Sequence, residues 1–168
     1  EILGSDLARQ VEGVGRNVSR FKPGDEVFGV APGSFAEYAC ADEDRLALKP
    51  ANVTFEDAAA VPIAGVSALQ GLRKGKIGPG QKVLIHGASG AVGTFAVQLA
   101  KSFGPEVTAV CSTRNLENAR LLGADHVIDY TREDFTKIGN TYDLILVVNG
   151  HRSVLAYRNA LSPKGICV

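Results

Sequence analysis

The sequence predicts an α/β protein in which a doubly wound parallel sheet follows a region of short β-strands. From residue 81 onward, short apolar runs rich in β-branched residues alternate with segments that repeat apolar residues at helical spacing. A glycine-rich turn joins the first of these runs, at 82–86, directly to the first helical segment. Alternation of strand and helix is typical of parallel sheets with crossover helices.

The turn at 87–93 has the layout that binds a dinucleotide. Ala88, Gly90 and Gly93 stand at the three small positions of a G-x-G-x-x-G pattern, with alanine in the first. Phosphate oxygens need backbone N–H groups at close range at a helix N-terminus, and larger side chains would hold them off. The alternative is an ordinary α/β turn that is rich in glycine. We predict pyrophosphate contacts at Ser89, Gly90, Ala91, Val92 and Gly93.

The expected elements of the second half follow from apolar runs and helical periodicity. Strands are predicted at 83–86, 107–111, 126–128, 144–148 and 165–168. Helical stripes begin at Val92, at Leu116 and at Val154, and the last stripe includes Leu161 and ends at Pro163. The first half reads as short strands at 11–14, 21–29, 35–40 and 45–48. Thr54 and Asp57 resemble a capping box at the start of a helical stretch that reaches Leu72.

Composition excludes several classes of protein. Hydrophobic residues make up 45% of the 168 residues, charged residues 21%, and the formal net charge is +0. A binder of nucleic acid needs a basic patch, and none is present in the sequence. The apolar runs are too short to cross a membrane and no signal pattern opens the chain, so we expect a cytoplasmic protein. The three cysteines lie far apart and are expected to be buried free thiols.

Both ends of the sequence indicate an internal fragment of a longer protein. The chain contains no methionine, begins at Glu1, and stops inside an apolar run at 166–168.

Several separate motifs carry a resemblance to a known family. They are Gly4-Ser5-Asp6 followed by Val11–Gly15, the turn at 21–29, Phe35–Tyr38, the helices at 58–69, the turn and helix at 83–101, and Leu122–Asp125. In these segments the chain resembles the medium-chain dehydrogenase/reductase superfamily, in particular its zinc-independent quinone oxidoreductase branch and NAD(P)-dependent alcohol dehydrogenase-like relatives. The resemblance implies a partial GroES-like catalytic barrel at 1–50, linking helices at 51–80, and a C-terminally truncated Rossmann domain at 81–168.

The same resemblance argues against zinc. Zinc-dependent members place a His-Glu pair after the glycine of the entry motif, where this chain has Ser5 and Asp6, and a further cysteine where it has Ile63. Serine is not a normal zinc ligand. The three histidines, at 86, 126 and 151, fall in different elements without partners at metal spacing. We predict no zinc.

The residues after the second strand of the sheet favour NADPH over NADH. A dinucleotide fold that prefers NAD carries a carboxylate there for the ribose 2′-OH. Here the chain has Ser112, Thr113 and Arg114, which can bind a 2′-phosphate. The alternative is that Ser112 and Thr113 cap the next helix and Arg114 is solvated. Helix capping and phosphate binding can both hold at once.

Three further contacts are implied by the resemblance. Tyr130 matches a position where relatives meet the 2′-phosphate, Asn149 would lie near the nicotinamide ribose, and Ser67 matches a hydroxyl that faces the cofactor. Each has a simpler alternative: a tyrosine at a strand end for Tyr130, and a cap or turn residue for Asn149 and Ser67.

The predicted function is an NADPH-dependent, zinc-independent oxidoreductase that transfers hydride to a quinone, enone or other small carbonyl compound. No nucleophile–base pair is evident, so no catalytic residue is predicted. A zinc-free alcohol or aldehyde dehydrogenase of the same superfamily and a non-catalytic NADPH-binding sensor are the alternatives. An S-adenosylmethionine-dependent methyltransferase is disfavoured, because it would need an acidic residue for its ribose. No nucleic-acid or membrane partner is expected, and a homodimer of the full-length protein rests on family analogy alone.

Overall fold

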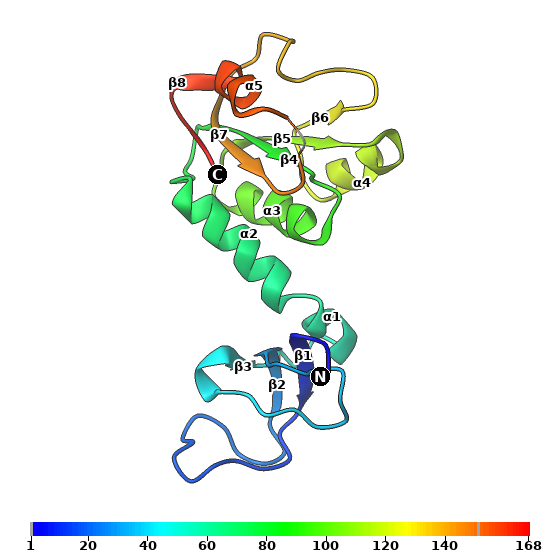
Figure 1. Ribbon diagram of the computed structural model, residues 1–168, viewed down its shortest axis with the longest axis vertical. Coiled ribbons are helices and arrows are strands. Elements are labelled where there is room, and N and C mark those ends of the chain that lie inside the picture. The colour runs from blue at the N-terminus through cyan, green and yellow to red at the C-terminus, as the bar shows by residue number, and fades with distance from the viewer. Residues whose placement is uncertain (1, 151) are drawn as a thin grey trace. The chain divides into compact units, whose positions relative to one another are not determined.

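The structure is a computed structural model that describes residues 2–150 and 152–168 (Figure 1). It contains two compact units, one ending at Val66 and the other beginning at Ser67.

The first unit contains a three-stranded antiparallel sheet in the order β1-β2-β3. Strand β1 spans Asp6–Gln10, β2 spans Glu26–Val30 and β3 spans Leu46–Leu48, which follows a short 3-10 helix at Glu43–Arg45. Helix α1 (Phe55–Ala59) begins where the sequence predicts, because Thr54 Oγ1 accepts a hydrogen bond from the Asp57 N–H at 3.1 Å. Helix α2 (Pro62–Lys74) contains the boundary between the units.

Two predicted strands of this unit are wrong. Residues 11–14 form a loop after β1, and only Val11 continues the pairing through its N–H to the Asp25 carbonyl. Residues 35–40 form turns, with Phe35 78% and Tyr38 73% exposed. Alternation of apolar and polar residues indicates a strand only when the apolar side chains form a buried face. In this segment the apolar side chains are exposed, so no such face forms.

The second unit is the predicted doubly wound α/β fold, which confirms the fold class. Its five strands lie in the order β6-β5-β4-β7-β8, and every neighbouring pair is parallel. The strands are β4 (Lys82–His86), β5 (Glu106–Cys111), β6 (His126–Asp129), β7 (Tyr142–Val147) and β8 (Leu161–Cys167). The helices are α3 (Ala91–Ser102), α4 (Leu116–Leu121) and α5 (Val154–Asn159).

Helices cover both faces of this sheet (Figure 1). Val83 and Ile85 point to the face that α2, α3 and α4 cover, where they pack with Leu72 and Val97. Leu84, from the same strand, points to the other face and packs with Ile145, Phe135 and Tyr157 of the α5 side. The continuous apolar runs of the sequence reflect this burial of strands on two sides.

The end of the chain differs from the prediction. Helix α5 ends at Asn159, and Leu161 belongs to β8, where it pairs with Tyr142 of β7. The predicted helix through Leu161 to Pro163 is therefore too long. An apolar residue that follows a helix at helical spacing can equally begin the next buried strand, and periodicity alone does not separate these cases.

Candidate nucleotide-binding cleft

A cleft of about 590 Å³ lies at the carboxyl edge of the parallel sheet. The chain order reverses between β4 and its neighbours β5 and β7, and ligands bind at such a reversal in open α/β sheets. Five of the lining residues were predicted from the sequence: Ser89, Gly90, Arg114, Tyr130 and Asn149. The other five were not predicted: His86, Gly87, Cys111, Asn115 and Arg152.

Three glycines of the turn have different structural roles. Gly87 has φ +91°, and a Cβ there would lie 2.8 Å from the Asn149 N atom, so this glycine brings the ends of β4 and β7 together. A Cβ on Gly93 would overlap the Gly87 carbonyl oxygen, so Gly93 lets α3 pack on the turn. A Cβ on Gly90 would meet only the Gly87 oxygen, at 3.8 Å, and would otherwise project into open space. Gly90 therefore leaves room for a ligand.

Helix α3 begins at this turn, directly after the lining residues Ser89 and Gly90. Gly90 is its N-cap residue in an extended conformation, and it contributes no side chain to the cap. The first N–H groups of a helix have no partner within the helix, so those of 91–93 are available to an anion. The Gly90 N–H bonds to the Gly87 carbonyl at 3.3 Å and is partly used within the turn. Ala91 and Val92 do not line the cleft, so their predicted contacts stay predictions.

The residues after β5 divide into two groups. Arg114, in the 3-10 helix at Thr113–Asn115, lines the cleft together with Tyr130, which follows β6. Ser112 and Thr113 do not line it. Ser112 Oγ accepts from Asn115 Nδ2 at 3.0 Å, and the Thr113 hydroxyl donates to the Asp129 carboxylate.

Asp129 is a buried carboxylate that the sequence reasoning missed. The carboxylate that would bind the ribose 2′-OH of NAD is expected at the end of β5, whereas Asp129 ends β6, the strand beside β5 in the sheet. The Asp129 carboxylate also accepts from the N–H and hydroxyl of Thr131, at 3.0 and 2.7 Å, and lies 3.6 Å from Arg132 Nε. The hydrogen bond from Thr113, aided by those from Thr131 and the Arg132 charge, lowers the pKa of Asp129 although burial opposes the shift. Asp129 is therefore ionised at neutral pH.

The other end of the cleft is built from β4, β7 and the start of α5. His86 is buried, and its Nδ1 lies 2.8 Å from the hydroxyl oxygen of Tyr157. Arg152 lies 3.3 Å from an Asp134 carboxylate oxygen. Asn149 is at the predicted strand end. Ser67, on α2, is exposed and does not line the cleft, so its predicted contact stays a prediction.

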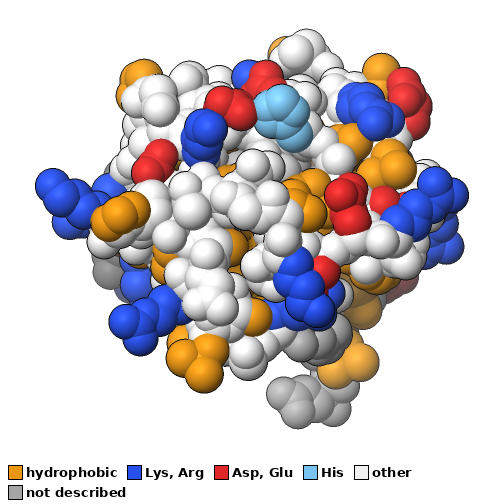
Figure 2. Space-filling model, turned by 90° about the horizontal axis from the view of Figure 1, so that it is seen from above, with side chains coloured by type: hydrophobic (Ala, Val, Ile, Leu, Met, Phe, Trp, Pro, Cys, Tyr) orange, Lys and Arg blue, Asp and Glu red, His pale blue; other side chains and the backbone are white. Residues whose placement is uncertain are grey.

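The charge of the cleft suits a phosphate-rich ligand. Arg114 and Arg152 contribute two positive charges, and none of its described lining residues is Asp or Glu. On the face drawn in Figure 2, acidic and basic side chains are interspersed. The charge of Arg114 fits a dinucleotide with a 2′-phosphate, whereas the charge of Arg152, at the other end of the cleft, is partly offset by Asp134.

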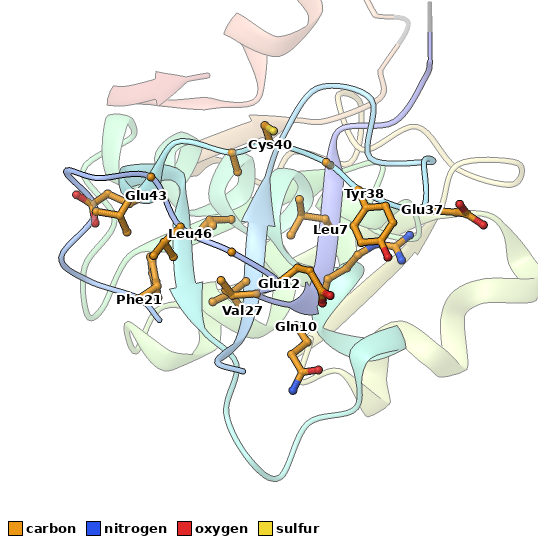
Figure 3. A pocket seen from close by; sticks show the side chains of 18 residues that line it. Leu7, Gln10, Glu12, Phe21, Val27, Glu37, Tyr38, Cys40, Glu43 and Leu46 are labelled. Atoms are coloured by element: carbon orange, nitrogen blue, oxygen red, sulfur yellow. The ribbon is translucent and has the colours of Figure 1, made fainter. Parts of the chain in front are cut away.

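A second cavity, of about 390 Å³, lies in the first unit (Figure 3). Apolar side chains, including Phe21 and Val27, line it together with the carboxylates of Glu12, Glu37 and Glu43. These acidic groups make it unsuitable for phosphate.

The positions relevant to zinc lie together without forming a ligand set. The Asp6 carboxylate accepts a hydrogen bond from the Ile63 N–H at 2.7 Å, at the start of α2. Across 2–150 and 152–168, no group of three or more His, Cys, Asp or Glu residues could hold a metal ion. His126 bonds to Glu106 at 2.8 Å, and His151 lies outside the described residues.

The thiols differ from the prediction in part. Cys111 is buried and free as predicted, and burial, followed by the charge of Asp129, raises the pKa of its thiol. Cys40 and Cys167 are exposed. In the described part of the chain, no helix is long and apolar enough to cross a membrane.

Comparison with known proteins was consistent with both units. Residues 1–51 match the family model of the alcohol dehydrogenase GroES-like domain, and residues 91–168 match that of the zinc-binding dehydrogenase. A 2-methylene-furan-3-one reductase from Solanum lycopersicum is 38% identical over 187 residues, which cover 98% of this chain and 48% of the relative. The chain thus spans about half the length of this curated relative.

Solved structures give the same result. The quinone oxidoreductase from Coxiella burnetii matches with a TM-score of 0.92 and 35% identity, over 98% of this chain and 54% of that one. The Escherichia coli quinone oxidoreductase complexed with NADPH matches with a TM-score of 0.88 and 29% identity, again over 98% and 54%. The chain belongs to the medium-chain dehydrogenase/reductase superfamily, in its quinone oxidoreductase-like branch.

Proposed function

We propose that this chain supplies the nucleotide-binding fold, and part of the catalytic barrel, of an NADPH-dependent, zinc-independent oxidoreductase. The reaction transfers hydride to a quinone, enone or other small carbonyl compound. The observation that carries the proposal is the cleft at the sheet reversal, which combines an open glycine turn with two arginines and no acidic lining residue.

The cleft residues would hold the cofactor in order along the sheet edge. The N–H groups of Ser89 and the first turn of α3 bind the pyrophosphate, and the space beside Gly90 admits it. Arg114 and Tyr130 hold the 2′-phosphate, because a guanidinium pairs with a phosphate dianion and a phenol donates to it. Asn149 orients the nicotinamide ribose, and Ser112, Thr113 and Ser67 remain predicted contacts.

NADPH, when bound, supplies the hydride, which carries both electrons of the reduction. The work of the described residues is to bind and orient it. Gly87 keeps the ends of β4 and β7 in contact, which fixes Asn149 beside the turn. Polarisation of the acceptor carbonyl is assigned to hydrogen-bond donors and to exclusion of water. Ser5 and Ile63 stand where the resemblance places zinc ligands, and the Asp6 carboxylate is occupied by the Ile63 N–H; these features support a reaction without zinc.

The substrate class is supported by the printed names of similar proteins. One names a methylene ketone, which is an enone, and others name quinones. Both are acceptors conjugated to a carbonyl group, which hydride reduces without a metal when the developing negative charge is stabilised. The predicted homodimer and the cytoplasmic location stay predictions.

Binding is tested first on the chain itself. Thermal unfolding is followed with NADPH, NADH and S-adenosylmethionine, and we expect NADPH to raise the midpoint most, because a ligand of the native state stabilises it. Gly90→Val should abolish this rise by filling the open space of the turn. Gly78→Val is the matched control, because a Cβ there likewise makes no close contact, meeting nothing within 4 Å, but lies before β4, at the opposite edge of the sheet.

Turnover is tested on the natural protein that carries this chain. NADPH oxidation at 340 nm (a property of the nicotinamide) is followed with a panel of quinones, enones, aldehydes and ketones. Reduction of quinones or enones supports the proposal. Turnover of saturated aldehydes or ketones alone would favour the alcohol dehydrogenase alternative, and binding without turnover would favour a sensor.

A further inference from the structure

We propose that Asp129 sets the preference between NADPH and NADH, because it holds the hydroxyl proton of Thr113 away from the nucleotide. This inference rests on the proposed function and adds a specificity-determining residue to it. Asp129 is not one of the residues that line the cleft, so it acts through its neighbours.

The Asp129 carboxylate accepts hydrogen bonds from the hydroxyl groups of two threonines. One carboxylate oxygen accepts from the Thr113 hydroxyl, and the other accepts from the N–H and the hydroxyl of Thr131. A hydroxyl has a single proton to donate, so neither threonine has one left for a ligand while Asp129 is ionised. The Asp129 side chain is 6% exposed, so water does not replace these bonds.

Both threonines adjoin residues of the cleft. Thr113 precedes Arg114 in the chain, and Thr131 follows Tyr130; Arg114 and Tyr130 both line the cleft. The carboxylate therefore connects the segment after β5 to the segment after β6, through residues that adjoin the two we assign to the 2′-phosphate. Thr113 does not itself line the cleft, and its hydroxyl could serve as a further donor beside Arg114 only if its proton were free.

The charge of Asp129 acts in the same direction. Asp129 is the register partner of Cys111, which lines the cleft, and its charge contributes to raising the pKa of that thiol. A negative charge whose effect reaches the cleft wall disfavours a dianionic 2′-phosphate more than a neutral 2′-hydroxyl. Arg132, 3.6 Å away, offsets part of this effect, but its side chain is 76% exposed and its charge is screened by solvent.

Arg114 and Asp129 therefore have opposite effects on the choice of cofactor. Arg114 favours NADPH, whereas Asp129 reduces that preference and allows NADH to compete. In the Asp129→Asn variant, the amide N–H₂ can donate to Thr113 Oγ1, which reverses the direction of that bond and frees the hydroxyl proton for a phosphate. The same substitution removes the negative charge.

The test measures the dissociation constants of NADPH and NADH by calorimetry on the full chain. Asp129→Asn should raise the preference for NADPH on the order of fivefold, from the lost charge repulsion together with one freed donor. Asp143→Asn is the matched control: its carboxylate also accepts from an N–H (Lys82, 2.9 Å) and a hydroxyl (Ser162, 2.8 Å), but at the amino edge of the sheet. The control should leave the preference unchanged.

Thr113→Val separates the hydroxyl from the charge. In the presence of Asp129 this substitution should leave the ratio of the two dissociation constants unchanged, because the proton is already engaged. Combined with Asp129→Asn, it should cancel part of the gain in preference. A lower NADPH preference from Thr113→Val alone would show that the hydroxyl already binds the phosphate, and would overturn the inference.

The outcomes also distinguish this inference from the proposed function. If both nucleotides bind and Asp129→Asn leaves their ratio unchanged, the role of Asp129 is overturned and the cofactor site stands. If the unaltered chain binds neither nucleotide, the proposed function itself fails. Because Thr113→Val retains the Asp129 carboxylate, a lower NADPH preference in this variant overturns the inference even if Asp129→Asn does not fold.

Discussion

His86 Nδ1 and the Tyr157 hydroxyl oxygen lie 2.8 Å apart, and this contact joins the end of β4 to α5. Both side chains are buried, and the two rings pack with Phe135 on the α5 face of the sheet. A Cβ on Gly150 would overlap the Tyr157 hydroxyl and lie 2.7 Å from His86 Nδ1, so the backbone after β7 also packs on this pair. The contact therefore holds three elements together behind the cleft.

Tyr157→Phe should lower the free energy of unfolding by about 1 kcal/mol, because it removes one buried hydrogen bond between the tyrosine hydroxyl and the imidazole. Urea unfolding followed by circular dichroism measures the change. Tyr130→Phe is the control: Tyr130 is 52% exposed, against 6% for Tyr157, and the same atom is removed. Equal stability of the Tyr157→Phe variant and the unaltered chain would contradict the assignment.

Gly93→Ala and Gly90→Ala add the same methyl group at two positions of one turn. At Gly93 it would overlap the Gly87 carbonyl oxygen, which is backbone and cannot turn aside, so we expect a loss of about 1–3 kcal/mol in unfolding free energy. At Gly90 the methyl meets nothing closer than 3.8 Å, so stability should change little while nucleotide affinity falls. Denaturation and calorimetry on both variants measure this separation. Equal losses of stability would count against it.

Arg114→Gln should weaken NADPH binding about tenfold and leave NADH nearly unaffected, because hydrogen bonds to charged groups contribute about 1.5–3 kcal/mol. Calorimetric titration with both nucleotides checks the asymmetry. Arg120→Gln is the matched control, since Arg120 lies on α4, pairs with Glu117 at 3.6 Å and does not line the cleft. A similar weakening for both nucleotides would show that Arg114 contacts another part of the cofactor.

Asp125 should make stability depend on pH in the acid range. Partial burial raises its pKa, but the hydrogen bonds from Lys101 Nζ and the Val107 N–H and the Lys101 charge together lower it below the ordinary value of 3.8. A group with a lowered pKa in the folded state stabilises above its ordinary pKa and loses this effect as the pH falls through the folded value.

The experiment compares urea unfolding of the unaltered chain and of Asp125→Asn between pH 7 and pH 2. We expect the unaltered chain to be more stable by about 1 kcal/mol at pH 7, allowing for solvent exposure of the ion pair, and the difference to shrink below pH 4. A difference that stays constant down to pH 2 would exclude the charge of Asp125 as its cause.

The parallel sheet could be predicted because its strands are buried on both faces. Such strands read as continuous β-branched runs, and the predicted 83–86 and 107–111 match β4 and β5 within one residue. The first unit was harder. Strand β1 buries only Leu7, so it carries no clear pattern, whereas 35–40 has the pattern but exposes its aromatic residues.

The site could be predicted where its residues are local in sequence. The spacing of small residues in the turn at 87–93 is enough by itself to predict a dinucleotide-binding turn. Asp129 and Arg152 join the site only through strand order, because β5 pairs with β6 and β4 with β7. A single sequence does not give this order, and so the contact between Thr113 and Asp129, sixteen residues apart, required the structure.

The separation of the buried strand cores from their loops has a consequence for how this fold changes over time. Leu84, Val110 and Ile145 are fully buried, whereas Arg114, Tyr130 and Asn149, which follow β5, β6 and β7, have more accessible positions. Substitutions in these loops can alter which coenzyme is accepted while the hydrophobic layers remain intact. Natural selection or protein engineering can therefore change the coenzyme preference while the fold stays stable.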